Sequence, residues 1–158
     1  MNQKKIGLYI HIPFCKKKCY YCDFPSYSGM DDYWEAYIDA LASELIQKAD
    51  EFQNPHVETV FIGGGTPSLI PAMCISKILD TVYSHYTVST DCECTIECNP
   101  GTLTGDKLKA YKDHGVNRLS IGLQACQDEI LKKLGRIHTC EDFLFSLELA
   151  RKHEFDNI

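Results

Sequence analysis

The sequence predicts an α/β fold in which parallel strands alternate with helices, as a barrel or as an open sheet. Short apolar runs rich in β-branched residues recur along the 158-residue chain. Longer segments with apolar residues at helical spacing separate these runs. A chain that alternates in this way forms parallel strands joined by right-handed crossovers.

The first expected elements are a strand at residues 5–12, "KIGLYIHI", and a helix at residues 31–50. That helix is predicted by apolar residues at helical spacing, namely Trp34, Ile38, Leu41 and Leu45. A second strand, residues 57–62, runs into the glycine-rich turn "GGGTP". A helix at 71–85 and a strand at 93–98, "ECTIEC", complete the next unit.

The second half of the chain continues the same alternation. A helix at about 103–114 precedes the strand "NRLSIGLQ" at 117–124, and helices are expected near 127–134 and 141–153. The last residues, "FDNI" at 155–158, resemble the start of a fifth strand. The chain is therefore expected to form part of a barrel rather than a closed one.

Composition excludes several classes of function. Acidic residues outnumber basic ones by 22 to 16, which argues against a nucleic-acid partner because a nucleic-acid groove shows clustered Lys and Arg. The apolar stretch near the N-terminus is too short and too interrupted for a signal peptide or an integral membrane segment. We therefore expect a cytoplasmic protein. Its nine cysteines would then be mostly reduced, and metal binding or burial explains them better than disulfides.

Three of these cysteines form a motif within "HIPFCKKKCYYCDF", residues 11–24: three residues separate Cys15 from Cys19, and two separate Cys19 from Cys22. Thiolates bind iron–sulfur clusters and structural zinc. A closed zinc site needs a fourth ligand, for which His11 and Asp23 are the nearby candidates. Burial of three small apolar residues is a weaker alternative, since the flanking lysines and prolines indicate a polar loop. With three protein ligands, a four-iron cluster would keep one iron open for chemistry.

This spacing resembles the radical S-adenosylmethionine superfamily, whose Cys-x-x-x-Cys-x-x-Cys loop holds a [4Fe–4S] cluster that binds S-adenosylmethionine at the fourth iron. Further motifs, in order "LYIHIPFC", "CYYCDF", "FIGGGTPS", "IECNPGT", "RLSIGLQ" and "LGRIHT", resemble the oxygen-independent coproporphyrinogen III oxidase family, and most of all its haem-chaperone (HemW) branch. The resemblance covers essentially the whole chain. It implies that residues 1–158 are the N-terminal portion of a TIM-like radical S-adenosylmethionine core domain, cut after about four βα units, without its later strands and C-terminal domain.

The resemblance also implies roles for individual residues. Cys15, Cys19 and Cys22 would bind the cluster. Gly64, Gly65 and Thr66 would meet the methionine end of the cofactor. Further cofactor-binding roles fall on Tyr9, Glu97, Gln124 and Arg136, with Glu97 suited to ribose hydroxyls and Arg136 to a carboxylate.

The alternation of residue types along the strands agrees with these implied roles. In each of three strands, residues of one parity are mostly polar or small and those of the other parity mostly apolar: the odd residues are the polar or small ones at 5–12 and 93–98, and the even ones at 117–124. Tyr9, Glu97 and Gln124 each fall on the polar or small side of their strand, so all three would lie on the ligand side. The same rule places Cys94 and Cys98 under the helices, as buried thiols rather than as ligands of a second cluster.

The reaction implied is reductive cleavage of S-adenosylmethionine, with an electron from a donor such as a flavodoxin or ferredoxin. Three functions stay open. A haem chaperone would bind haem and pass it to an unknown acceptor protein, whereas an oxidase would decarboxylate coproporphyrinogen III, a porphyrinogen. The oxidase motif typically has a further cysteine two residues after the third, where this chain has Phe24, which favours the chaperone. The third reading is a non-catalytic iron–sulfur or zinc module, so whether the protein is an enzyme stays open.

Overall fold

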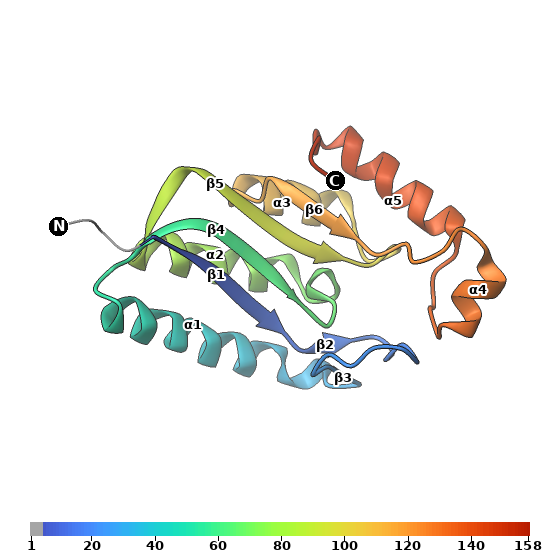
Figure 1. Cartoon of the computed structure of the whole chain (residues 1–158), viewed down its shortest axis with the longest axis horizontal. Helices are drawn as coiled ribbons and strands as arrows, with labels where there is room; N and C mark the ends of the chain where they lie inside the picture. Colours follow the sequence, from blue (N-terminus) through green and yellow to red (C-terminus); the bar gives the residue numbers. More distant parts are fainter. Residues whose placement is uncertain (1–4) are drawn as a thin grey trace.

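The computed structural model describes residues 5–158. Its centre is a parallel four-stranded sheet in the order β1-β4-β5-β6 (Figure 1). The strands are β1 (Lys5–Ile12), β4 (His56–Gly64), β5 (Thr87–Cys98) and β6 (Arg118–Ile121). All neighbouring pairs are parallel, as the alternation of strands and helices predicts.

Helices connect the strands. They are α1 (Trp34–Glu51), α2 (Ala72–His85), α3 (Gly105–Asp113), α4 (Asp128–Lys133) and α5 (Cys140–Lys152). Helices α1, α2 and α3 follow the sheet along one face, while α4 and α5 lie beyond β6 (Figure 1). Two short 3-10 turns, η1 (Asp31–Tyr33) and η2 (Pro67–Leu69), precede α1 and α2. A two-residue pair, β2 (Phe14–Cys15) with β3 (Tyr27–Ser28), closes the cysteine loop at its ends. The α/β architecture of parallel strands with outer helices is as predicted.

The core lies between the sheet and these helices, and strand parity decides which side chains enter it. Along β1 the even residues Ile10 and Ile12 are buried, whereas Lys5, Gly7 and Tyr9 are exposed. The even residues of β5 from Cys92 to Cys98 are likewise buried. They pack with apolar side chains of the helices, among them Ile38, Leu45, Ile75, Ile78, Leu79, Val82 and Leu108. The predicted division between a helix side and a ligand side is therefore confirmed.

Two of the expected strands differ from the structure by three or more residues at one end. β5 begins at Thr87, well before residue 93. The prediction of a strand up to residue 124 is wrong, because β6 ends at Ile121. Beyond that point the N–H of Leu123 donates to the carbonyl of Ile121 (3.1 Å), and the N–H of Ala125 donates to that of Leu123 (2.9 Å). These tight turns take the backbone out of the sheet.

The expected fifth strand at 155–158 is not formed. The segment nevertheless contacts β6, because the N–H of Leu119 donates to the carbonyl of Asn157 at 3.0 Å. One backbone hydrogen bond is too little for a strand.

Candidate functional site

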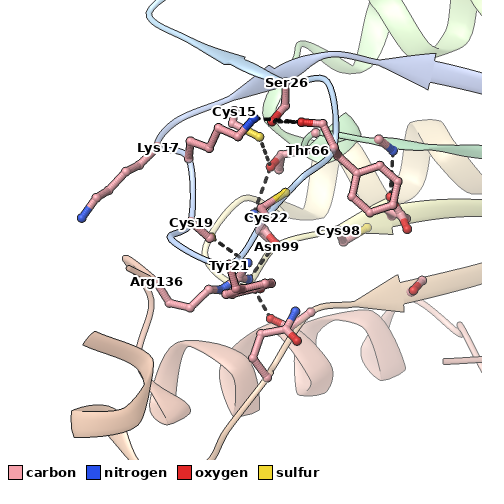
Figure 2. Close-up of a pocket in the computed structure, with 18 residues that line it drawn as sticks. Cys15, Lys17, Cys19, Tyr21, Cys22, Ser26, Thr66, Cys98, Asn99 and Arg136 are labelled. Atoms are coloured by element: carbon pink, nitrogen blue, oxygen red, sulfur yellow. Dashed lines mark hydrogen bonds between the residues drawn. The ribbon is translucent and has the colours of Figure 1, made fainter. Parts of the chain in front are cut away.

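The carboxyl ends of all four strands meet at one edge of the sheet, where parallel α/β folds bind their ligands. β1 leads into the cysteine loop, and β4 ends in the glycine turn. β5 is followed by Asn99, and β6 by Gly122. Between these segments lies a pocket of about 220 Å³ (Figure 2).

The structure brings nearly all of the predicted site residues into this pocket. Its walls include Cys15, Cys19, Cys22, Gly64, Gly65, Thr66, Glu97, Gln124 and Arg136. They come from motifs that lie far apart in the sequence. Gln124 reaches the pocket from a left-handed backbone conformation (φ 69°) after β6, and not from within a strand as predicted.

The three motif cysteines are free thiols, each half-buried. The hydroxyl of Thr66 lies 3.6 Å from Sγ of Cys15, and Nη1 of Arg136 lies 3.6 Å from Sγ of Cys19. The N–H of Cys22 donates to the carbonyl of Cys19 at 3.2 Å, which tightens the loop between them. Two of the thiols therefore have hydrogen-bond donors from other segments directed at them.

The glycine turn fits closely against the cysteine loop and β5. Gly64 has φ +115°, and its N–H donates to Oε2 of Glu97 at 2.9 Å. A Cβ atom at Gly64 would lie 2.5 Å from Cε1 of His11, so a side chain has neither the conformation nor the space it needs. The N–H of Gly65 donates to the carbonyl of Ile12 at 2.8 Å. Backbone contacts therefore hold the turn against the start of the cysteine loop.

Tyr9 is the exception among the predicted site residues, because it does not line this pocket. It points to the ligand side of the sheet, 56% exposed, and its hydroxyl lies 3.0 Å from Nδ1 of His11. Nε2 of His11 lies 2.8 Å from the carbonyl of Pro25, which can only accept a hydrogen bond. Nε2 therefore carries the proton, and Nδ1 accepts from Tyr9. Through His11, Tyr9 supports the far end of the cysteine loop, and direct contact with a cofactor stays a prediction.

A model of the radical SAM superfamily matches residues 9–158. The chain belongs to the radical SAM superfamily. The haem chaperone HemW of Bacillus subtilis (strain 168) is 41% identical over 151 residues, which are 95% of this chain and 40% of that protein. HemW of Escherichia coli (strain K12) is also 41% identical, over 146 residues covering 92% of this chain and 39% of that protein. The chain thus spans about two fifths of the length of these relatives.

A solved structure agrees with this assignment. Coproporphyrinogen III oxidase (HemN) from Escherichia coli, described as a radical SAM enzyme, superimposes with a TM-score of 0.88 at 30% identity. The match covers 98% of this chain and 36% of that one. The parallel sheet and its outer helices are therefore part of a radical SAM barrel.

The pocket of this radical SAM chain offers three thiols as possible metal ligands. Within residues 5–158, no three His, Cys, Asp or Glu side chains converge on one metal-ion position. In a four-iron cluster each thiolate binds a different iron, so the sulfurs need not converge. Lys17 and Lys18 also line the pocket; the ammonium of Lys18 donates to the carbonyl of Phe24 at 2.9 Å, and that of Lys17 lies 5.4 Å from the centre of the Tyr20 ring. The three thiols of the pocket are donors of the kind that iron–sulfur clusters use.

Several residues on the pocket wall were not predicted as site residues, among them Tyr21, Asn99 and Gly122. The carbonyl of Gly122 accepts a hydrogen bond from Arg136 (2.8 Å), and a Cβ there would lie 3.3 Å from both Nη2 of Arg136 and Oδ1 of Asn99. Burial raises the pKa of Tyr21, while the charge of Arg136 acts to lower it. Asn99 carried a usable signal, because it follows Glu97 by two residues and so continues the same face. The role of Gly122 depends on its contact with Arg136, and no local sequence pattern indicates that contact.

The other cysteines of β5 lie where parity placed them. Cys94 is 1% and Cys98 is 3% exposed, and both pack into the core between sheet and helices. Burial raises the pKa of each thiol to about 12. These side chains behave as small apolar residues. Within the described part of the chain, no helix has the length and apolar character that a membrane crossing needs.

Proposed function

We propose that this radical SAM protein is a haem chaperone of the HemW type, which holds a [4Fe–4S] cluster and S-adenosylmethionine in the pocket at the strand ends. The observation that carries the proposal is the convergence of the three thiols with the glycine turn, Glu97, Gln124 and Arg136 on one pocket. The 41% identity to two HemW proteins, whose name includes the function of haem chaperone, supports the choice of branch.

In this proposal Cys15, Cys19 and Cys22 hold the cluster, which when bound supplies the electron for reductive cleavage of S-adenosylmethionine. The electron would arrive from a flavodoxin or ferredoxin. The lysines of the cysteine loop would offset part of the negative charge of the bound group. Gly64 and Gly65, which lack side chains, leave the backbone open to the methionine end of the cofactor.

The remaining polar groups would orient S-adenosylmethionine. One carboxylate oxygen of Glu97, Oε2, accepts from the N–H of Gly64, which holds the side chain in place and leaves the other oxygen for ribose hydroxyls. Arg136 offers a planar fork to a carboxylate, and its contacts with Asn99 and Gly122 fix the direction of that fork. Gln124 adds an amide that can both donate and accept. Tyr9 would act from outside the pocket, through His11.

The first experiment tests the cluster. Anaerobic reconstitution of the protein with iron and sulfide should give about four irons per chain, with thiolate-to-iron absorption in the visible range. Cys22→Ser should lose this iron. The matched control is Cys126→Ser, which changes an exposed cysteine outside the pocket and should keep it. Binding of one zinc and no iron would contradict the cluster and favour a structural metal module.

A second candidate function is oxygen-independent coproporphyrinogen III oxidase, favoured by the fit to the HemN structure. Against it stands Phe24, 56% exposed on the pocket wall, at the position where the oxidase motif typically has its additional cysteine. Two measurements separate the functions: haem binding followed by Soret absorption, and conversion of coproporphyrinogen III under reducing, anaerobic conditions with S-adenosylmethionine. We expect haem binding without decarboxylation. Protoporphyrinogen formation at enzymatic rates would reverse this ranking.

A further inference from the structure

A continuous row of side-chain contacts joins two of the three motif cysteines through the pocket wall (Figure 2). The hydroxyl of Thr66 donates to Sγ of Cys15 (3.6 Å) and lies 3.0 Å from Nδ2 of Asn99. Oδ1 of Asn99 lies 2.8 Å from Nη2 of Arg136, whose Nη1 lies 3.6 Å from Sγ of Cys19. Asn99 is the middle of this row and touches neither thiol in these contacts.

The chemistry of the groups fixes the direction of every hydrogen bond in the row. A guanidinium has donors only, so the oxygen of the Asn99 amide must face Arg136. The NH₂ group then faces Thr66 and donates to its oxygen. Because a hydroxyl has a single proton, and Thr66 accepts from Asn99, that proton is free to point at Cys15. Both ends of the row therefore donate to sulfur. The orientation of the Asn99 amide is what leaves the Thr66 proton free to do so.

The backbone of Asn99 is anchored on both sides. Its N–H donates to the hydroxyl of Ser68 at 3.1 Å, and its carbonyl accepts from the hydroxyl of Thr102 at 2.7 Å. The hydroxyls of Ser68 and Thr102 are in turn 2.6 Å apart. This support holds the Asn99 side chain in one position between two loops. Hydrogen bonds therefore hold Asn99 in place between Thr66 and Arg136.

We propose that Asn99 is a positioning residue that directs the hydrogen bonds of Thr66 and Arg136 onto the Cys15 and Cys19 thiolates, and so raises the reduction potential of the cluster. The proposal rests on the proposed function, in which these thiolates bind iron. Reduction adds negative charge to the cluster, and donors at its sulfurs stabilise the reduced form. Without Asn99, the Thr66 hydroxyl can turn away and the Arg136 fork loses one of its acceptors.

The test is Asn99→Ala in the anaerobically reconstituted protein, with the midpoint potential measured by redox titration followed by electron paramagnetic resonance. We expect a shift to more negative potential at unchanged iron content. The matched control is Asn117→Ala, because Asn117 also makes two side-chain hydrogen bonds, accepting from the N–H of Cys94 (2.9 Å) and donating to the carbonyl of Cys92 (2.8 Å). It does not line the pocket, so its loss should lower stability and leave the potential unchanged.

Thr66→Val is the second variant, for the case that Asn99→Ala does not retain iron. Valine has nearly the shape of threonine but cannot donate to Cys15, so the potential should again fall. A wild-type protein without a cluster would reject the proposed function together with this inference. The other negative outcome is a wild-type protein that holds the cluster while Thr66→Val, and Asn99→Ala where that variant holds iron, show the same potential as wild type. That outcome would overturn the role of Asn99 alone and leave the proposed function intact.

Discussion

Replacing Cys94 and Cys98 together by alanine should reduce stability and leave the iron content unchanged. Three cysteines lie close together in "DCECTIEC", which invites the interpretation of a second cluster. The structure places both thiols under the helices, in the same core as Ile96. Cys98 is among the residues that line the pocket, but Glu97 faces the pocket and adjacent strand residues point to opposite sides, so the Cys98 thiol points into the core, 3.6 Å from the carbonyl of Ile96.

The expected cost follows from the size and position of the deleted atoms. Each substitution removes one heavy atom from a fully buried site, comparable with Ile→Val, which costs about 0.5–1.5 kcal/mol. The two residues are four positions apart on one strand, or roughly 13 Å. Sites separated by more than about 10 Å usually contribute additively. The double variant should therefore lose about 1–3 kcal/mol in free energy of unfolding, close to the sum of the single variants, by the same estimate.

Denaturant unfolding followed by circular dichroism measures the loss of stability, and iron per chain is determined in parallel after reconstitution. Alkylation gives an independent check. Burial raises the pKa of both thiols to about 12, so they form little of the thiolate that reacts with alkylating agents. Native Cys94 and Cys98 should thus stay unlabelled while the exposed Cys126 reacts. A drop in iron in the double variant, with the fold intact by circular dichroism, would refute the parity argument.

Three further outcomes are expected. Glu97→Ala and Arg136→Ala should each weaken S-adenosylmethionine binding by about 1–3 kcal/mol, measured by calorimetry, with the cluster retained, since neither is an iron ligand; unchanged affinity in both would remove their proposed roles. Gly64→Ala should cost about 1–3 kcal/mol of stability, because φ +115° is strained for alanine, and a thermal midpoint equal to wild type would contradict this. Asp142→Asn should cost about 1 kcal/mol at neutral pH, because Asp142 completes the capping box of α5 with Thr139. Hydrogen bonds from Thr139 lower the pKa of Asp142, so this difference should disappear as the pH falls through the lowered pKa, and a difference independent of pH would count against the cap.

The sequence by itself determined the fold class, the cysteine loop and the sides of the strands. Period-2 alternation is a local property, so residues 93–98 alone indicated that Glu97 and Cys98 face opposite sides. The spacing of Cys15, Cys19 and Cys22 is equally local, since it lies within eight residues of one loop. The ends of the strands were less accessible. β6 stops at Ile121 because the chain folds into tight turns there, although its pattern continues to Gln124.

Only the tertiary structure decided which groups surround the thiols. The contact of Arg136 with Cys19 joins residues 117 positions apart, and its contact with Asn99 spans 37. Such pairs depend on how strand ends from separate βα units meet, and local periodicity carries no information on that meeting. The direction of the Thr66 hydroxyl is a further step removed, because it depends on an amide that Arg136 orients. Tyr9 shows the same dependence on tertiary contacts. Its parity is that of a ligand-side residue, but the Tyr9 hydroxyl bonds to His11, which in turn bonds to the carbonyl of Pro25 in the cysteine loop.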